Sequence, residues 1–373
     1  MRQGTTLFIS LVRKIPKSMM QNTIDEFRAD LRSRILTARD HLHILLLGHL
    51  NGVSSLRQLI ALGQDLPELR SALGMPSIAR STLAEANRSR SYMFFRALMA
   101  QVLQACHQAA DHRPKRLRRI RYCLDSTCVE LCAALFDWAA VSRERAAVKI
   151  HVLLRSGVAL PRLIFVQDGA THDVKVAKTM PIPPGSIVSM DRGYVDGQLF
   201  ADLHDRDILF VTRLKRGMKY RVVRRRKVPS VAAAIRTDQE IELTGAGART
   251  YGQRPLRRIS YTDPQTGQRL VFLTNSLELA ARTIAGLYKE RWQVELFFKW
   301  IKQNLRVTSF WGRTQNGLLV QLWVALLAYA LVAWINLTIR TGWTRLRTLR
   351  FVMARLLQPV PVNFWQPDVQ DAK

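Results

Sequence analysis

The feature that most constrains the fold is the stretch from Ile284 to Leu305, which has the composition of one amphipathic helix. After Gly286 it contains no glycine or proline, and most of its residues are good helix formers. At about 100° per residue, its apolar side chains gather on one side of the helix. They predict a core-facing stripe formed by Leu287, Val294, Phe297, Phe298, Ile301 and Leu305.

A second stripe on the same helix is polar. With Tyr288 as the origin, Arg291 falls at about −60° and Glu295 at about −20° around the helix axis. Lys302 follows at about −40°, whereas Glu290 points roughly 200° away and leaves the stripe. A solvated helix face would also explain this pattern, so its meaning depends on residues elsewhere in the chain.

The charge of the chain is strongly positive. Its 373 residues include 57 Lys and Arg against 28 Asp and Glu, which gives a net charge of +29. This length suggests two or three domains, and the imbalance predicts a polyanionic partner. Nucleic acid is the first candidate, and an anionic membrane surface is the rival.

Cysteines and apolar runs narrow the class of protein further. No CxxC pair occurs, which argues against a zinc site, and we expect buried reduced thiols in a cytosolic protein. The N-terminus lacks the apolar region of a signal peptide. Residues 317–337 are long enough to span a bilayer, but they contain Gln321 and Asn336, so we favour a buried core helix. The cysteines are Cys106, Cys123, Cys128 and Cys132.

The first domain, residues 1–115, is predicted to be helical and to bind DNA. A turn at residues 74–76 between two short helices suits a helix-turn-helix. The helix after this turn carries Arg80 and Arg88, which can contact phosphates, although any exposed helix can carry such residues. The expected helices are Ile24–Ala38, His41–Leu50, Leu56–Leu62, Pro67–Leu73 and Ser77–Arg90.

The basic run His112–Arg121 is expected to link this domain to an α/β core whose first part covers residues 116–214. One strand pattern ends at Asp125 and another, Ile187–Met190, ends at Asp191. Further strands and helices are predicted at Val129–Leu135, Ala147–Leu154, Leu160–Val166, Asp173–Thr179, Val195–Leu203 and Ile208–Arg213.

The remainder of the chain divides into three predicted parts. Residues 215–267 are rich in arginine and glycine with short strand patterns, which indicates a β-rich insertion. Its Arg224, Arg225 and Arg226 are predicted to contact DNA phosphates. Residues 268–350 form the second part of the core, with the amphipathic and apolar helices. Residues 351–373 are expected to be a C-terminal tail.

Three carboxylates lie in the two parts of the predicted core. Asp125 and Asp191 each follow a strand, and Glu295 projects from the amphipathic helix. Carboxylates are hard oxygen ligands that suit Mg²⁺ or Mn²⁺. Two such ions about 3.5–4 Å apart can activate water or a 3′-hydroxyl at a phosphodiester. His172 and Asp173 precede Asp191 and could act in acid–base chemistry, but we expect an ordinary loop contact.

The order of these parts resembles the DDE transposases of insertion sequences, over about residues 119–333. The resemblance rests on YCLDST around Asp125, MDRGY around Asp191, FVTRLK at Phe210–Lys215, and the Tyr288–Arg291–Glu295–Lys302 spacing of the family's Y-R-E-K signature. It implies an α/β fold with a retroviral-integrase or ribonuclease-H-like core, interrupted by a β-rich insertion and preceded by a helical N-terminal domain.

The resemblance also implies roles for residues and partners. Asp125, Asp191 and Glu295 would be catalytic metal ligands, and the remaining stripe residues, Tyr288, Arg291 and Lys302, would hold DNA phosphates. The implied reaction is metal-dependent cleavage at transposon ends with strand transfer into target DNA. The implied partners are double-stranded DNA, at terminal inverted repeats and target sites, and a second copy of the chain on the DNA ends.

Three further expectations accompany this resemblance. It implies a bacterial cytoplasmic protein that associates with the nucleoid and has no membrane partner. Family members also flip a base at the transposon end, and Trp292 and Tyr261 are the candidates for an aromatic that stacks on it. A nuclease or resolvase without strand transfer and a non-catalytic DNA-binding protein remain as alternatives.

Overall fold

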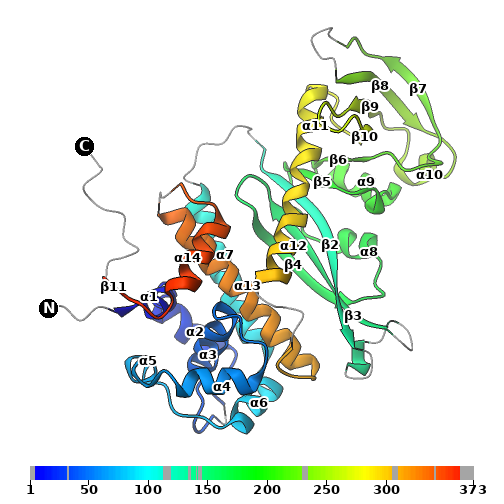
Figure 1. Cartoon of the computed structure of the whole chain (residues 1–373). Helices are drawn as coiled ribbons and strands as arrows, with labels where there is room; N and C mark the ends of the chain where they lie inside the picture. The colour runs from blue at the N-terminus through cyan, green and yellow to red at the C-terminus, as the bar shows by residue number, and fades with distance from the viewer. Residues whose placement is uncertain are drawn as a thin grey trace, which may run out of the picture. The chain divides into compact units, whose positions relative to one another are not determined.

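The computed structural model describes residues 5–31, 33–111, 119–132, 136–139, 141, 145–228, 234–304, 310–339 and 342–361. The chain divides into two compact units. Unit 1 takes its described residues from Met1–Pro114, Leu131–Trp138 and Lys299–Lys373, and unit 2 takes its own from Lys115–Glu130 and Ala139–Phe298. Together they form a mixed α/β protein with one large sheet, which lies in unit 2 (Figure 1).

The large sheet has the order β4-β3-β2-β5-β6-β10-β9-β8-β7 among the described residues. Strands β2, β5 and β6 run parallel to one another in its middle, and antiparallel pairs flank them on both sides. The strands are β2 Arg121–Cys132, β3 Arg145–Arg155, β4 Leu160–Asp168, β5 Ile187–Met190, β6 Leu209–Arg213, β7 Tyr220–Arg225, β8 Ile235–Leu243, β9 Leu256–Thr262 and β10 Arg269–Thr274.

The burial of strand β5 shows that the middle of the sheet is covered on both faces. All four of its residues are buried, as expected for a parallel strand between two layers of helices. Val188 and Met190 face a core cluster shared with α9 (Gly197–Asp205), and α8 (Asp173–Thr179) contributes to the same cluster. Ile187 faces the opposite cluster, which includes α11 (Ala281–Glu290). The period of two along the strand therefore sorts its side chains between two cores.

Residues 215–267, the predicted insertion, extend this sheet. Strand β10 pairs with β6, and β9, β8 and β7 follow outward as antiparallel neighbours, with α10 (Ala246–Tyr251) in the same segment. The strand ladder is therefore continuous from the parallel strands to the outer strand β7.

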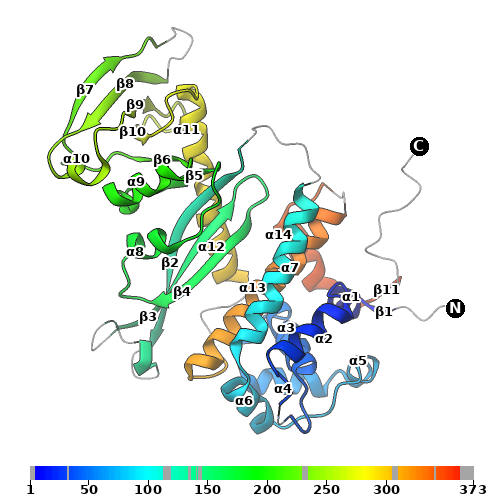
Figure 2. The same cartoon turned by 180° about the vertical axis from the view of Figure 1, so that it is seen from behind.

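Unit 1 is built around α13 (Gln315–Thr338), which packs along α7 and α3 (Figure 2). By length and composition α13 could cross a membrane, but 89% of its most apolar window is buried in the structure. The other elements of unit 1 are β1 Thr5–Thr6, α1 Leu7–Val12, α2 Lys17–Glu26, α3 Ala38–Leu50, α4 Leu56–Gln64, α5 Pro67–Leu73, α6 Arg80–Ser89, α7 Tyr92–Asp111, α14 Arg345–Arg355 and β11 Pro359–Val360.

Several predicted bounds in unit 1 are wrong in detail: the helix predicted at Ser77–Arg90 begins only at Arg80, and two further predictions differ more. The expected helix Ile24–Ala38 ends at Glu26, because Arg28 adopts a left-handed conformation with φ 47°. The Thr37 hydroxyl then caps α3 by accepting the Asp40 N–H at 3.1 Å, which starts a new helix. The expected tail also begins too early, since α14 runs to Arg355 and β11 pairs with β1.

A buried ion pair fastens the outer strands of unit 2. The Arg257 guanidinium on β9 donates to both carboxylate oxygens of Asp238 on β8, at 2.8 and 2.5 Å, and also to the Leu279 carbonyl. The side chains of Arg257 and Asp238 are only 4% and 7% exposed. Removing either partner would therefore leave a buried charge without compensation.

We predict that Asp238→Ala lowers the free energy of unfolding by about 3–5 kcal/mol, because it leaves the Arg257 charge buried and unpaired. Chemical denaturation measures this loss. The matched control is Arg221→Ala, which breaks the exposed pair with Glu242 and should cost less than about 1 kcal/mol. Equal losses in the two variants would contradict the prediction.

Candidate active site

Asp125 and Asp191 lie side by side because their strands are parallel neighbours. Leu124 on β2 is in register with Met190 on β5, so the next residue on each strand is an aspartate. The prediction that both aspartates end a strand is right for Asp191 and wrong for Asp125, since β2 continues to Cys132. The pairing of β2 with β5 nevertheless stops at Leu124, which leaves Asp125 at the end of the paired region.

The turn after β5 fixes the carboxylate of Asp191. Its Oδ1 accepts the Gly193 N–H at 2.8 Å, and a Cβ added to Gly193 would lie 2.9 Å from that oxygen. Such a contact is shorter than real Cβ atoms show, so the close approach explains why a glycine stands there. The buried Thr212 hydroxyl on β6 donates to the Asp191 carbonyl at 2.9 Å and holds the backbone.

Arg291 connects the first aspartate to Glu295. Its Nη1 donates to Asp125 Oδ2 at 2.9 Å, and its Nη2 donates to Glu295 Oε1 at 2.5 Å. The Tyr288 ring lies under the same guanidinium, with 5.6 Å between the ring centroid and Arg291 Cζ. Tyr288, Arg291 and Glu295 therefore meet beside Asp125, as the stripe predicts.

The predicted single helix Ile284–Leu305 is two helices that meet at Arg291. Helix α11 ends at Glu290 and α12 covers Trp292–Asn304, while Leu305 lies outside the described residues. The N–H of Arg291 bonds to the Tyr288 carbonyl at 3.1 Å, and the N–H of Val294 bonds to the Arg291 carbonyl at 3.1 Å. This three-residue spacing tightens the backbone locally at the residue that bridges the two acids.

The three acids share one electrostatic environment. Burial raises the pKa of Asp125 to about 6, and the charges of Asp191 and Glu295 act in the same direction. The Ser126 N–H and the Arg291 guanidinium oppose this shift without overcoming it. An ionised Asp125 therefore depends on nearby positive charge, which Arg291 supplies in part.

The donor set fits a hard divalent cation, because it consists of carboxylate oxygens. Among the described residues, however, no three acidic, His or Cys side chains close around one point as ligands. Arg291 instead occupies the space between Asp125 and Glu295. A cation bound by these acids would neutralise part of the negative charge that the Arg291 guanidinium otherwise neutralises.

Comparison with known proteins decides the family. Residues 117–331, more than half of the chain, match the family model of the transposase DDE domain. The chain belongs to the DDE transposases. Residues 3–62 also match a domain of unknown function (DUF4372). DDE transposases are DNA-binding enzymes that cleave DNA and transfer strands, and the family generally uses divalent metal ions.

Curated relatives agree with this assignment. The chain is 28% identical over 307 residues to a probable transposase for insertion sequence element IS5377 from Geobacillus stearothermophilus, covering 81% of this chain and 78% of the relative. It is 29% identical over 296 residues to the putative transposase y4zB from Sinorhizobium fredii, covering 75% and 81% of the two chains. The piggyBac transposase synaptic complex with hairpin DNA, solved by cryo-electron microscopy, aligns with a TM-score of 0.46 at 11% identity, over 96% of this chain and 82% of that chain.

Glu290 has a structural role in the transposase. It leaves the polar stripe as predicted, but its carboxylate pairs with Arg121 at 3.0 Å and accepts a hydrogen bond from the Ser156 hydroxyl. Its carbonyl also lies 3.2 Å from the Cys123 thiol, which donates to it. These contacts fasten the end of α11 to β2 and to the turn after β3, so replacing Glu290 would disturb the packing of α11 on the sheet.

The other residues of the amphipathic helix differ in exposure. Lys302 stands two turns beyond Glu295 on α12, on the same side by helical periodicity. Of the two aromatic candidates, Trp292 is 58% exposed and Tyr261 only 7%. Trp292 is therefore open to a partner molecule, whereas Tyr261 is covered by its neighbours.

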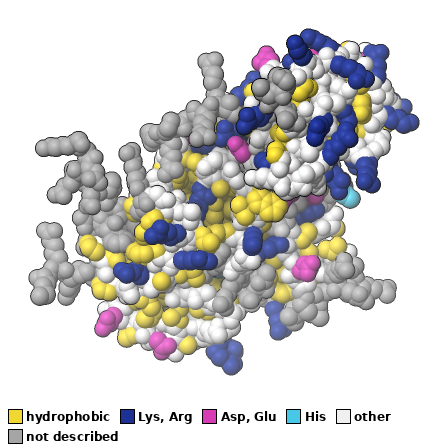
Figure 3. Space-filling model, turned by 45° about the horizontal axis from the view of Figure 1, so that its top comes forward, with side chains coloured by type: hydrophobic (Ala, Val, Ile, Leu, Met, Phe, Trp, Pro, Cys, Tyr) yellow, Lys and Arg dark blue, Asp and Glu magenta, His cyan; other side chains and the backbone are white. Residues whose placement is uncertain are grey.

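The arginines of the predicted insertion separate into two kinds. Arg224 and Arg225 lie exposed on β7, although Arg224 stands 3.8 Å from Glu240. Arg226 is less exposed, at 29%, and donates to the Leu277 carbonyl at 2.5 Å. Figure 3 shows Lys and Arg side chains gathered over this part of unit 2. The run His112–Arg121 lies largely outside the described residues.

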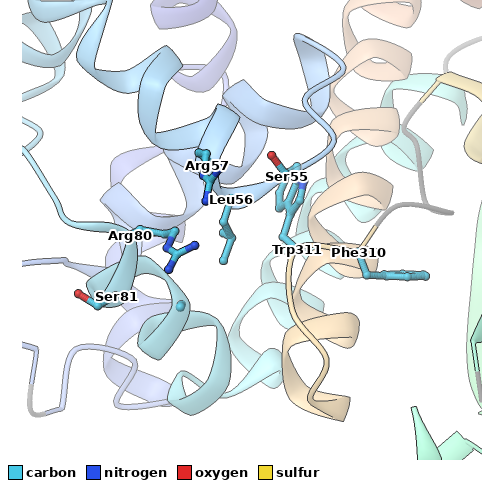
Figure 4. A pocket seen from close by; sticks show the side chains of 8 residues that line it. Ser55, Leu56, Arg57, Arg80, Ser81, Phe310 and Trp311 are labelled. Atoms are coloured by element: carbon cyan, nitrogen blue, oxygen red, sulfur yellow. The ribbon is translucent and has the colours of Figure 1, made fainter. Parts of the chain in front are cut away.

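Arg80 and Arg88 of unit 1 also differ. Arg80 and Arg57 line a hollow of about 570 Å³, where α4 and α6 begin and where Trp311 forms a wall (Figure 4). None of the described residues that line this hollow carries a carboxylate. Arg88 instead makes a two-pronged ion pair with Glu85 on its own helix, at 2.9 Å for both contacts. Arg80 therefore has the better geometry for phosphate.

Asp173 and the thiols complete the account of predicted residues. Asp173 is the first residue of α8, as the predicted helix Asp173–Thr179 requires. Its carboxylate accepts a hydrogen bond from Ser126, the neighbour of Asp125, and so makes more than the ordinary loop contact that was expected. Cys106 and Cys123 are buried as expected, whereas Cys128 is exposed.

We predict that Arg291→Ala slows cleavage of a labelled transposon-end duplex by one to three orders of magnitude, or about 1.4–4 kcal/mol in barrier. The reason is that the guanidinium orients two acids at once. Arg291→Lys should recover only part of the rate, because an ammonium cannot form two directed bonds in one plane. Wild-type rates for Arg291→Ala would show that the bridge is dispensable.

Proposed function

We propose that Asp125, Asp191 and Glu295 form the catalytic centre of this DNA transposase. The observation that carries the proposal is the Arg291 bridge, which joins Asp125 to Glu295 beside the strand that leads to Asp191. Arg291 and Asp125, which meet in this bridge, lie 166 positions apart in the chain. A structural salt bridge alone would not need a third acid on the neighbouring parallel strand.

The strand order supports a ribonuclease-H-like core. The β4-β3-β2 strands lie on one side, β5 and β6 continue parallel to β2, and a helix bearing the third acid follows later in the chain. In this interpretation residues 116–214 and 268–350 contribute the two parts of the core. Strands β7–β9 are an insertion between Asp191 and Glu295, and residues 1–115 are the helical N-terminal domain.

The three acids would hold Mg²⁺ or Mn²⁺. Bound there, the metal would activate the attacking hydroxyl and stabilise the leaving oxygen at a phosphodiester. The protein's own contribution is orientation. Gly193 and Thr212 hold Asp191, and Arg291 holds Asp125 and Glu295. A preorganised site needs little rearrangement when DNA arrives.

Cations of both units would hold the DNA. Tyr288, Arg291 and Lys302 would grip phosphates at the transposon end in the manner of the Y-R-E-K signature. Arg224 and Arg225 on β7 and Arg80 of unit 1 would bind further phosphates. Arg226 and Arg88 would contribute less, because the Leu277 carbonyl and the Glu85 carboxylate already accept their hydrogen bonds. We further propose a homodimer on the two DNA ends, acting in the bacterial cytoplasm at the nucleoid without a membrane partner.

We predict that Asp125→Asn, Asp191→Asn and Glu295→Gln each abolish cleavage and strand transfer, because each removes a charged oxygen ligand. Chelation of divalent ions should do the same in the wild type. The control is Glu278→Gln, an exposed carboxylate of the same unit, which should keep full activity. Cleavage without joining by the wild type would indicate a nuclease or resolvase instead.

We predict that Arg224→Gln with Arg225→Gln flattens the salt dependence of DNA binding. Each lost phosphate contact should reduce the slope of log K against log salt by about 0.9, or about 1.8 for the pair. Binding titrations at several salt concentrations measure the slope. Arg13→Gln with Lys17→Gln, which removes two exposed charges from unit 1, serves as the charge-matched control. An unchanged slope in the β7 variant would mean that these arginines only favour solubility.

A further inference from the structure

A cluster of polar side chains lies directly behind Asp125 and is not explained by the proposed chemistry. It is assembled from β2, β3, α8 and the short 3₁₀ turn Arg192–Tyr194 after Asp191. Every member belongs to unit 2. The members are Ser126, Lys149, His151, Asp173 and Tyr194.

Asp173 is the centre of this cluster. Its Oδ1 accepts the Ser126 hydroxyl at 2.7 Å and lies 2.9 Å from Lys149 Nζ. His151 Nδ1 lies 3.6 Å from the same oxygen. Lys149 Nζ also donates to the Thr171 carbonyl at 3.3 Å, so its position is fixed from two directions.

Ser126 connects this cluster to the catalytic centre. Its backbone N–H donates to Asp125 Oδ1 at 2.9 Å, while its hydroxyl donates to Asp173. The other oxygen of Asp125 accepts from Arg291. Both oxygens of Asp125 are therefore oriented, and one of the two anchors is a residue that Asp173 holds in place.

The surroundings make this arrangement rigid. His151 is fully buried, and Tyr194 is 1% exposed. Burial raises the pKa of the Tyr194 hydroxyl, and the negative charges of Asp173 and Asp125 raise it further. Burial alone would raise the pKa of Asp173, but hydrogen bonds from Lys149 and Ser126 keep it below the usual value. Asp173 thus remains an ionised acceptor.

We propose that Asp173 is a positioning residue of the transposase, which acts through Ser126 to fix the carboxylate of Asp125. This inference rests on the proposed role of Asp125 in catalysis. Without the Asp173 carboxylate, the Ser126 hydroxyl loses its charged acceptor. The part of β2 that follows Asp125 is then no longer hydrogen-bonded to α8 through Ser126. The Asp125 carboxylate then samples more orientations, which weakens its contribution to a metal site.

The plain alternative is that Asp173 only fastens α8 to the sheet. In that case its loss would lower stability and leave the properties of the folded site unchanged. The two roles differ in measurable ways. A positioning role changes metal affinity and cleavage rate in folded protein, and its effect depends on Ser126.

The experiment compares full-length Asp173→Asn, Ser126→Ala, the double variant and Ser126→Thr with wild type. Asp168→Asn is the matched control, since Asp168 is an exposed acid that accepts bonds from Ala170 and Thr171 in the turn before α8. Calorimetric titration with Mn²⁺ alone measures metal binding, and thermal unfolding measures stability. Single-turnover cleavage of a labelled end duplex, with DNA saturating, measures the chemical step.

Asp173→Asn and Ser126→Ala should each weaken Mn²⁺ binding and slow cleavage by about 10- to 100-fold, and the double variant should lose little more than either single variant. Ser126→Thr, which keeps the hydroxyl, should stay near wild type, as should Asp168→Asn. The inference is overturned if Asp173→Asn keeps wild-type Mn²⁺ binding and cleavage, or if its loss of activity equals the fraction of protein that is unfolded. It is also overturned if the fold-losses of Asp173→Asn and Ser126→Ala multiply in the double variant, since independent effects would do so.

Asp125→Asn separates this test from the proposed function. If Asp125→Asn loses cleavage while Asp173→Asn retains it, the catalytic assignment stands and only the positioning role fails. If Asp125→Asn cleaves normally, the catalytic assignment itself fails.

Discussion

The arrangement of unit 2 depends on one guanidinium between two carboxylates. Arg291 satisfies Asp125 from β2 and Glu295 from α12, and its planar fork suits two acceptors at once. Around it the backbone changes from one helix to the next, and Glu290 pins the end of the first helix to β2. The Arg291 guanidinium stabilises the site because it balances the negative charges of Asp125 and Glu295. A divalent ion could compete with it for the same carboxylate oxygens.

Local chemistry in the sequence predicted much of this structure. Helices α5 and α8 have the predicted bounds, and the Ser55 hydroxyl caps α4 by accepting the Gln58 N–H. The neighbourhood of Asp125 and Asp191 followed from two apolar strands that each lead to an acid, since parallel strands bring such positions to one region of a sheet. The stripe of Tyr288, Arg291 and Glu295 followed from helical periodicity alone.

What the sequence did not reveal depends on partners far away in the chain. Periodicity cannot show a break at Arg291, because the residue keeps helical dihedral angles and only its hydrogen-bond spacing changes. The sequence predicted a separate strand at Val129–Leu135 and did not show that β2 runs without interruption from Arg121 to Cys132, past the end of its pairing with β5. Asp173 was interpreted as a loop contact for the same reason, since its meaning comes from Lys149 and Ser126.

The position of β7 has a consequence for how copies of the protein avoid one another. It is an outer strand of the large sheet, so one row of its backbone N–H and C=O groups has no strand partner among the described residues. Such an edge invites pairing with a strand of another chain, and Val222 and Val223 on it are exposed. Arg224 and Arg225 place two like charges along this edge, and a second copy approaching in the same way would meet its own charges. When no polyanion neutralises these arginines, their like charges would oppose the pairing of two such edges.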